Sequence, residues 1–279
     1  MSWCHRASFA LMTIALLAIT GCPATQTADP VAPQAAAPRG APVAASSVGD
    51  EHVSTPRYRI DVSYPALTGD EAPLSAMLHR IAKAARQGFL QALPDPRIFP
   101  EFANRQLQLR IDFRLAARSN AFTSIREAGF QDTGGAHPAP IDAAIVYDIH
   151  AQRTVPLDDL FARPGAARKA LADFARAGLT EKMMAQAPRA GEGSPDAIRE
   201  WKANAMRMIA DGTAPTQQNF ANFIVRAGAN PDDPSPGLTL IFPPYQVAAY
   251  VYGTQTVDVP ARVFAAYLEP RYQAAFATD

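Results

Sequence analysis

The feature that most constrains the fold is a strict alternation of apolar and polar side chains over residues 106–115. Leucine, isoleucine and phenylalanine occupy every second position, and glutamine, arginine and aspartate fill the positions between them. A period of two predicts a β-strand with one face in the core and the other in water. One solvated face is typical of antiparallel sheets, so we expect an antiparallel sheet around this strand.

The rest of the chain after residue 56 alternates between strand-like and helix-like patterns. Residues 57–64 repeat the period of two, and apolar residues at helical spacing predict a helix over about 71–93. Further strands are expected at 122–130, 143–149, 219–226 and 256–259. A short helical turn is expected at 157–161, and helices are expected at 166–186, from Ser194 to Gly212 and from Pro260 to Leu268. This order predicts the α+β class, with antiparallel sheets and packed helices.

A diproline corner interrupts the most aromatic part of the sequence. Residues 238–242 read as a strand, which Pro243 and Pro244 must end because proline cannot donate to a ladder. Tyr245 follows the corner directly, and residues 245–252 are rich enough in aromatic and β-branched residues to predict a return strand. No nucleophile, base and orienting group occur together here. The pattern therefore indicates a binding surface, not a catalytic one.

Composition excludes several function classes. Lys+Arg and Asp+Glu are both 26, so the formal net charge is zero, which argues against a nucleic-acid binder or a polybasic membrane-surface protein. The only cysteines are Cys4 and Cys22, both N-terminal, so the folded region has no disulfide, thiolate metal site or cysteine nucleophile. We expect no cofactor.

The N-terminal residues resemble the signal of a bacterial lipoprotein. His5 and Arg6 precede an apolar run at 9–19, which has the length of a signal-peptide core and is too short to span a bilayer. Small residues then lead to Cys22, as in a lipobox, where cleavage before the cysteine is followed by its acylation. Pro23, in place of aspartate, fits outer-membrane sorting. The alternative is an ordinary signal peptide with a chance cysteine.

Three segments follow from this resemblance. We expect a lipoprotein signal peptide at residues 1–21, lipidation at Cys22, and a disordered Pro/Ala-rich linker at residues 22–56 that cannot bury enough surface to fold. The expected location is the periplasmic face of the outer membrane.

Catalytic and metal sites are weakly supported. His137 follows two glycines, and a histidine that fixes its own turn by a backbone hydrogen bond is favoured over a ligand or a base. The histidines show no metal spacing. The acids that could form a glycosidase pair are Asp142, Asp148, Asp158 and Asp159, but aspartates at turns commonly cap. We therefore predict no enzyme, no catalytic residue and no metal.

Several short motifs occur in a recognisable order. They are Thr-Gly-Gly-Ala-His at 133–137, Val-Pro-Leu-Asp-Asp-Leu-Phe at 155–161, Phe-x-x-Tyr-x-Val at 242–247, Gly253, and Val-x-Val-Pro at 257–260. Together they resemble the extracytoplasmic domain family of the lysozyme-binding anti-sigma factor RsiV, also found beside the deacetylase domain of PdaC and in a secreted mycobacterial antigen. The resemblance covers roughly residues 57–268.

The resemblance implies two interlocked halves, residues 57–150 and an RsiV-like half at residues 151–279, and lysozyme binding without catalysis. We expect no cytoplasmic anti-sigma segment and no membrane-spanning helix here, so only the binding role would carry over.

The function expected from the sequence is a periplasm-facing lipoprotein that binds and inhibits a lysozyme-like peptidoglycan hydrolase, as an inhibitor or an immunity protein. The expected partner-binding residues are Pro243, Pro244, Tyr245, Tyr250, Gly134, Gly135 and His137. Two alternatives remain open. In the first, the domain is a peptidoglycan- or glycan-binding module. In the second, either Tyr250 or Tyr252 packs against a sheet face and does not contact a partner.

Overall fold

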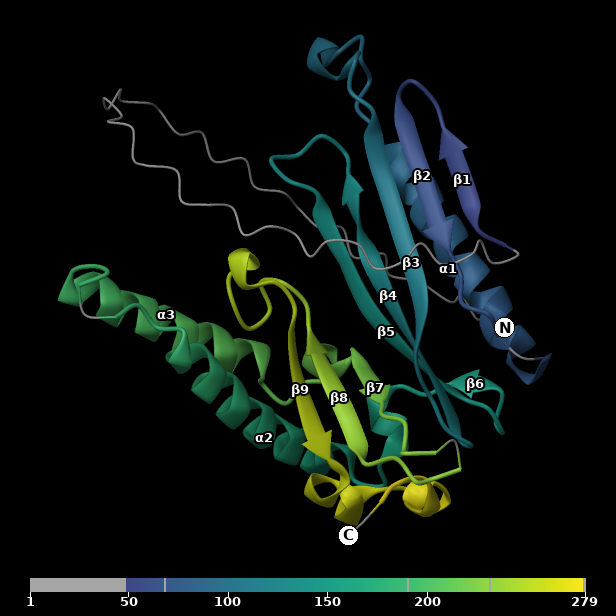
Figure 1. Ribbon diagram of the computed structural model, residues 1–279, viewed down its shortest axis with the longest axis vertical. Helices are drawn as coiled ribbons and strands as arrows, with labels where there is room; N and C mark the ends of the chain where they lie inside the picture. The colour runs from purple at the N-terminus through teal and green to yellow at the C-terminus, as the bar shows by residue number, and fades with distance from the viewer. Residues whose placement is uncertain (1–48, 68, 190, 231, 278–279) are drawn as a thin grey trace, which may run out of the picture. The chain divides into compact units, whose positions relative to one another are not determined.

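The fold is α+β, as predicted, with two sheets and three long helices among the described residues (Figure 1). A computed structural model describes residues 49–67, 69–189, 191–230 and 232–277, and all of them belong to the same compact unit. The predicted signal peptide and Cys22 lie outside the described residues, as does most of the predicted linker. Within the described residues, no helix combines the length and apolar character needed to span a bilayer.

The first sheet has six strands in sequential order, β1-β2-β3-β4-β5-β6. The bounds are β1 Glu51–Ser54, β2 Tyr58–Ser63, β3 Leu107–Arg118, β4 Phe122–Asp132, β5 Ala139–Asp148 and β6 Arg153–Thr154, with helix α1, Ala72–Ala92, between β2 and β3. β1 begins inside the predicted linker 22–56, so the ordered chain starts earlier than expected. β6 lies beyond residue 150, the predicted boundary between the halves.

One strand pair departs from the predicted antiparallel sheet. β2 and β3 pair in parallel, from Tyr58 opposite Leu107 to Ser63 opposite Asp112. The other pairs of this sheet are antiparallel. The reason is α1, because a helix between two strands returns the chain to the end of the sheet from which it left.

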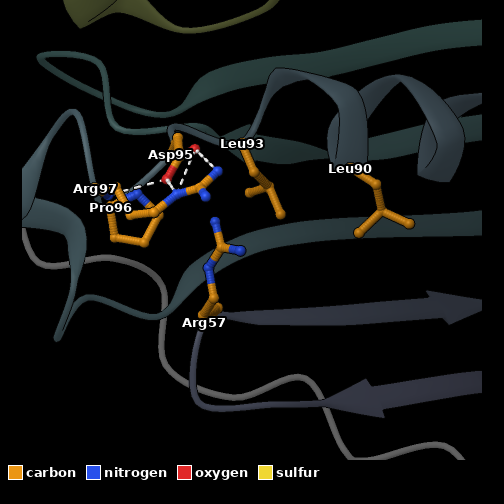
Figure 2. Close-up of a pocket in the computed structure, with 6 residues that line it drawn as sticks. All are labelled: Arg57, Leu90, Leu93, Asp95, Pro96 and Arg97. Carbon is orange, nitrogen blue, oxygen red and sulfur yellow. Dashed lines mark hydrogen bonds and ion pairs between the residues drawn. The ribbon is translucent and has the colours of Figure 1, made fainter.

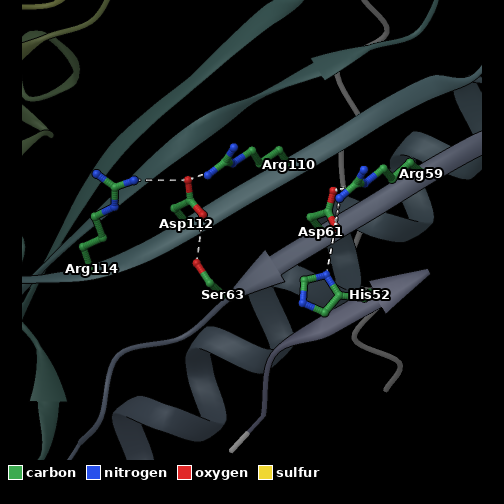
Figure 3. Close-up of polar contacts among 7 residues, drawn as sticks. All are labelled: His52, Arg59, Asp61, Ser63, Arg110, Asp112 and Arg114. Carbon is green, nitrogen blue, oxygen red and sulfur yellow. Dashed lines mark hydrogen bonds and ion pairs between the residues drawn. The ribbon is translucent and has the colours of Figure 1, made fainter. Parts of the chain in front are cut away.

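The two faces of the first sheet have different surroundings. The apolar face packs under α1 in a core that contains Ile60, Val62, Leu74, Leu78, Ala82, Phe89, Leu107, Leu109, Ile111, Phe113, Ile125 and Tyr147. The apolar residues of β2, and those of β3 as far as Phe113, therefore face inward at every second position, as predicted. Leu115, which the alternation also placed on the inner face, is instead 40% exposed, where the register between β3 and β4 shifts. Their polar neighbours form an opposite face of paired charges over β1, β2 and β3 (Figure 3).

The C-terminal half pairs helices α2, Pro164–Ala185, and α3, Pro195–Gly212, with a three-stranded antiparallel sheet. Its strands are β7 Phe223–Val225, β8 Gly237–Phe242 and β9 Gln255–Pro260. Ser194 caps α3 as predicted, since its hydroxyl accepts a hydrogen bond from the Ala197 amide at 3.1 Å.

Two predicted elements of this half are shorter than expected. The strand at 219–226 is limited to β7, because Gln218–Phe220 forms a 3₁₀ turn. The closing helix from Pro260 is absent: Pro260 is the last residue of β9, and two 3₁₀ turns follow, Ala261–Val263 and Ala265–Tyr267.

Side chains of the first sheet complete the core of the C-terminal half. Phe122 of β4 and Val146 of β5 belong to the same buried cluster as the residues of α2, β7 and β8. The Ser124 hydroxyl also accepts a hydrogen bond from the Val225 amide at 3.1 Å and donates one to the Val225 carbonyl at 3.2 Å. The two halves are therefore interlocked by shared packing.

Candidate functional site

The aromatic segment after the diproline corner is a turn and not the predicted return strand. The Tyr245 amide donates to the Ala248 carbonyl and the Gln246 amide to the Pro243 carbonyl, both at 3.1 Å. Tyr250–Tyr252 then forms a 3₁₀ turn, and pairing with β8 resumes only at Gln255. Local hydrogen bonds satisfy the backbone of this segment, so it leaves the sheet as a loop, here called the β8–β9 loop.

Tyr245 has the left-handed backbone φ of 72°, which a residue with a side chain rarely adopts. The two hydrogen bonds across the turn hold it there, and the half-buried Pro243 and Pro244 fix the chain that enters it. This conformation directs the Tyr245 ring outward, and 53% of the residue is exposed. The prediction that Tyr245 projects from the corner is confirmed.

Three of the predicted residues meet in one stack of rings, here called the turn cluster: His137, Tyr245 and Tyr250. The His137 ring lies 4.8 Å from that of Tyr250, and the two tyrosine rings are 5.4 Å apart, with small angles between the ring planes. The Tyr245 hydroxyl is 3.3 Å from His137 Nε2. The cluster joins the β4–β5 turn to the β8–β9 loop, which are more than a hundred residues apart in sequence.

Hydrogen bonding assigns the protons of the turn cluster. His137 Nδ1 is 3.1 Å from the Pro138 carbonyl, which can only accept, so Nδ1 carries the hydrogen. In the neutral ring Nε2 is then the acceptor, and the Tyr245 hydroxyl donates to it. The backbone bond expected of a turn-fixing histidine is thus present, and the same ring also positions Tyr245.

The surface of the loop is more apolar than the sequence indicated. Tyr250 is 39% exposed and Val251 82% exposed, so Tyr250 does not pack against a sheet face. Tyr252 does turn inward, where its hydroxyl accepts from the Trp201 indole at 3.1 Å. Val251 was missed because a lone valine inside a strand-like run carries no signal of exposure.

The two glycines of the β4–β5 turn have unequal roles. Gly134 has φ of 96°, and a Cβ at this position would lie 2.5 Å from the ring of Phe102. Gly135 has neither constraint, since its nearest neighbour would be the His137 carbonyl oxygen at 3.7 Å. Only Gly134 is therefore required by the turn. No sequence pattern pointed to Phe102, which reaches the turn from the connection between α1 and β3.

A buried aspartate ties the β8–β9 loop to the first sheet. Asp142 of β5 forms an ion pair with Arg126 of β4 and accepts a hydrogen bond from the Thr254 hydroxyl. The Asp142 side chain is only 7% exposed and that of Arg126 is 21% exposed. The sequence marked Asp142 only as a possible catalytic acid, and the structure shows it holding the loop.

The other three candidate acids also have structural partners. Asp148 accepts from the Ala151 amide at 2.8 Å and the Tyr272 hydroxyl at 3.0 Å. Asp158 pairs with Arg168, and Asp159 pairs with Arg153 at 2.8 Å. Among the residues that the structure describes, no group of three potential metal ligands lies together.

Part of the chain matches a known family model. Residues 158–262 match the sequence model of a family described as "Protein of unknown function (DUF3298)". This segment contains α2, α3, the second sheet and the β8–β9 loop. No curated protein matches the chain.

Two solved structures are similar to this chain. The crystal structure of a DUF3298 family protein from Pseudomonas aeruginosa PAO1 is 14% identical with a TM-score of 0.51, over 82% of this chain and 93% of that chain. A member of the same family from Bacteroides fragilis NCTC 9343 is 16% identical with a TM-score of 0.47, over 77% of this chain and 85% of that chain. The first of these likenesses shows a shared fold.

Proposed function

We propose that this protein is a lipoprotein of the periplasmic side of the outer membrane whose turn cluster binds and inhibits a lysozyme-like peptidoglycan hydrolase. The DUF3298 match and the ordered motifs at 133–137 and 242–260 support placing the domain with the RsiV-like family. The lipid anchor at Cys22 is part of the proposal. Inhibition would serve either as defence against a host lysozyme or as immunity to a rival's hydrolase.

The observation that carries the proposal is the exposed and fixed ring of Tyr245. A tyrosine offers a large contact area and a hydroxyl, and tyrosines are enriched among the residues that dominate binding energy. The ring is already ordered by its stack with His137 and Tyr250 and by a braced backbone. A side chain that is ordered before binding loses little entropy in the complex, which favours tight association.

Inhibition by this surface needs no chemical step. The β8–β9 loop would insert Tyr245 into the concave substrate cleft of the hydrolase and exclude the polysaccharide. The bond between Thr254 and Asp142 would keep the loop from yielding under the contact, because it links the loop to β5, where Asp142 is also paired with Arg126 of β4. The role of the protein is then to present a rigid shape.

The test is an inhibition assay with the full mature chain, which must retain residue 49 onward because β1 belongs to the sheet. Increasing amounts are added to a C-type lysozyme and to a bacterial muramidase acting on purified peptidoglycan. We expect inhibition by the wild type and at least about a thirtyfold weaker effect with Tyr245→Ala, the loss of a dominant contact. Met206→Ala is the matched control, since Met206 is 44% exposed on α3.

Absence of inhibition with every muramidase tested would contradict the proposal. A glycan-binding module is the alternative function, because exposed aromatic rings also stack against sugar rings. Sedimentation with purified sacculi separates the two. Binding to sacculi that is lost in Tyr245→Ala, without inhibition of any hydrolase, would assign the turn cluster to peptidoglycan.

A further inference from the structure

Exposed apolar side chains are concentrated in two loops. The large hydrophobic residues that are exposed among the described ones are Leu90, Ile98, Phe99, Leu115, Met206, Tyr245, Tyr250 and Val251. Three belong to the β8–β9 loop, and three others belong to the last turns of α1 or to the connection between α1 and β3. Single exposed apolar residues are ordinary, but a gathering of them marks an interaction surface.

The connection after α1 holds its apolar residues rigidly. Ile98 is 69% exposed and Phe99 47% exposed. Their amides both donate to the Asp95 carbonyl, at 2.9 and 2.8 Å, and the Asp95 side chain is held by Arg97 at 2.6 Å. The backbone hydrogen bonds of this segment are thus satisfied while its apolar side chains face solvent.

This connection adjoins the turn cluster through the β4–β5 turn. The rings of Phe99 and Phe102 are 6.5 Å apart, and the Phe102 ring occupies the space beside Gly134. Arg105 adds an ion pair to Asp132 at 2.8 Å. The β4–β5 turn carries His137 against the tyrosines on its other side. The connection after α1, the β4–β5 turn and the β8–β9 loop each lie at the upper end of their strands in Figure 1.

A depression lies next to the exposed pair Ile98 and Phe99. It has a volume of about 420 Å³ and is lined by Arg57, Leu90, Leu93, Asp95, Pro96 and Arg97 (Figure 2). Leu90 and Leu93 give it an apolar side, and the Arg57 guanidinium, which donates to the Pro94 carbonyl at 3.0 Å, borders it. A partner's side chain that has an apolar stem and an acceptor at its tip would fit both features.

The exposed apolar area of the β8–β9 loop alone is too small for a stable complex. The exposed parts of Tyr245, Tyr250 and Val251 amount to roughly 300 Å², taking about 200 Å² for a whole aromatic side chain. A stable interface covers about 800 Å² of each partner. A protein bound at the turn cluster must therefore cover neighbouring surface, and the surface continuous with it across the β4–β5 turn is the connection after α1.

We infer that Ile98, Phe99 and the depression beside them form a second contact for the same protein partner that takes Tyr245. The inference rests on the proposed function, because it assumes that the turn cluster binds a folded protein. The partner then spans three loops, with Tyr245 in its cleft and Ile98 and Phe99 against the rim of that cleft. The second contact adds affinity and selects among hydrolases by the shape of the rim.

The test measures the affinity of the full mature protein for a C-type lysozyme and a bacterial muramidase by titration calorimetry. The variant is Ile98→Ser combined with Phe99→Ser, which removes exposed surface and leaves the core intact. We expect at least about tenfold weaker binding, as for the loss of one strong interface residue. Leu115→Ser is the matched control, because Leu115 is 40% exposed at the other end of β3.

The outcomes separate this inference from the proposed function. Unchanged affinity in the Ile98→Ser, Phe99→Ser variant, together with weakened binding by Tyr245→Ala, overturns the second contact and leaves the proposed function standing. Wild-type protein that binds no muramidase overturns both.

Amide hydrogen exchange gives an independent reading on the unmutated protein. In the complex we expect slower exchange in residues 97–102 as well as in the β8–β9 loop. Protection of the β8–β9 loop alone overturns the second contact. The other occupant to test is lipid, with vesicles of phosphatidylethanolamine and phosphatidylglycerol as the probe. If the Ile98→Ser, Phe99→Ser variant loses binding to the vesicles but binds muramidase as the wild type does, the second contact is also overturned.

Discussion

Two solvent-exposed regions at the first sheet differ in how completely contacts within the chain satisfy their side chains. On the open face of β1, β2 and β3, each aspartate has its own hydrogen-bonding partners (Figure 3). Asp61 is 2.6 Å from Arg59 and 2.8 Å from His52, while Asp112 contacts Arg110 at 3.0 Å, Arg114 at 3.3 Å and the Ser63 hydroxyl at 2.8 Å. The second region is the end of the sheet at the β4–β5 turn, together with the β8–β9 loop, here called the loop end. It carries the turn cluster, whose rings contact one another but remain partly exposed to water.

The difference shows that exposure alone does not identify a binding surface. The open face is neutralised internally, so a partner would have to break existing ion pairs to use its charges, and such pairs at a surface gain little. The loop end exposes apolar area that nothing in the described chain covers, and covering it is favourable. The following four predictions test this contrast.

The largest expected effect comes from comparing two aspartates. Asp142→Asn should lower the free energy of unfolding by about 2–3 kcal/mol, because it leaves the largely buried Arg126 without its carboxylate. Asp112→Asn, on the open face, should cost less than about 1 kcal/mol. Urea unfolding measures both. Equal costs would mean that the loop end and the open face are held in the same way.

The second prediction compares the two glycines of the β4–β5 turn. Gly134→Ala should destabilise the protein by about 1–2 kcal/mol, since the left-handed backbone and the Phe102 ring both oppose a Cβ. It should also weaken partner binding by moving His137. Gly135→Ala should change neither the melting temperature nor the affinity. A Gly134→Ala protein with wild-type stability and binding would show that the turn is not fixed by Phe102.

The third prediction separates strain from contact at Tyr245. Tyr245→Gly and Tyr245→Ala remove the same ring, but glycine tolerates the φ of 72° and alanine does not. Tyr245→Gly should therefore be about 1 kcal/mol more stable than Tyr245→Ala by thermal unfolding, with both defective in binding. If alanine proved the more stable, the left-handed conformation would not be the source of the strain.

The smallest effect is expected at Asp61 on the open face. Partial burial alone would raise the pKa of Asp61, but hydrogen bonds from Arg59 and His52 outweigh it and lower the pKa. A lowered folded-state pKa contributes stability above the unfolded pKa of about 3.9 and loses it as the pH falls through the folded value. Asp61→Asn should thus cost under about 1 kcal/mol at pH 7, and this cost should shrink as the pH falls below about 3.9. Partner affinity at pH 7 should not change.

Much of the fold was predictable because it depends on short periodic patterns. The alternation in β2 and β3 and the apolar spacing of α1 each place one face in a core, and the structure shows those faces buried. The cap at Ser194 was equally local. The parallel pairing of β2 with β3 was not predicted, because a strand with one solvated face reads the same in either direction.

The candidate site was only partly predictable, for a physical reason. Residues 245–252 have the composition of a strand, but hydrogen bonds within the turn and the preceding prolines outweigh that tendency. His137 and Tyr245 belong to two motifs that were identified separately in the sequence, and the structure brings these motifs into contact. Phe102, Thr254 and the exposed pair Ile98 and Phe99 gave no signal, since their roles arise from contacts between distant segments.

Sharing of Phe122 and Val146 between the halves has a consequence for how this architecture can be divided. The segment that matches DUF3298 begins at residue 158, after both side chains. Without Phe122 and Val146, that segment alone would leave the apolar inner side of β7 and β8 exposed to water. The segment should therefore not fold autonomously. Heating the intact protein should accordingly melt both sheets in one cooperative transition, and recombination that preserves function should exchange them together.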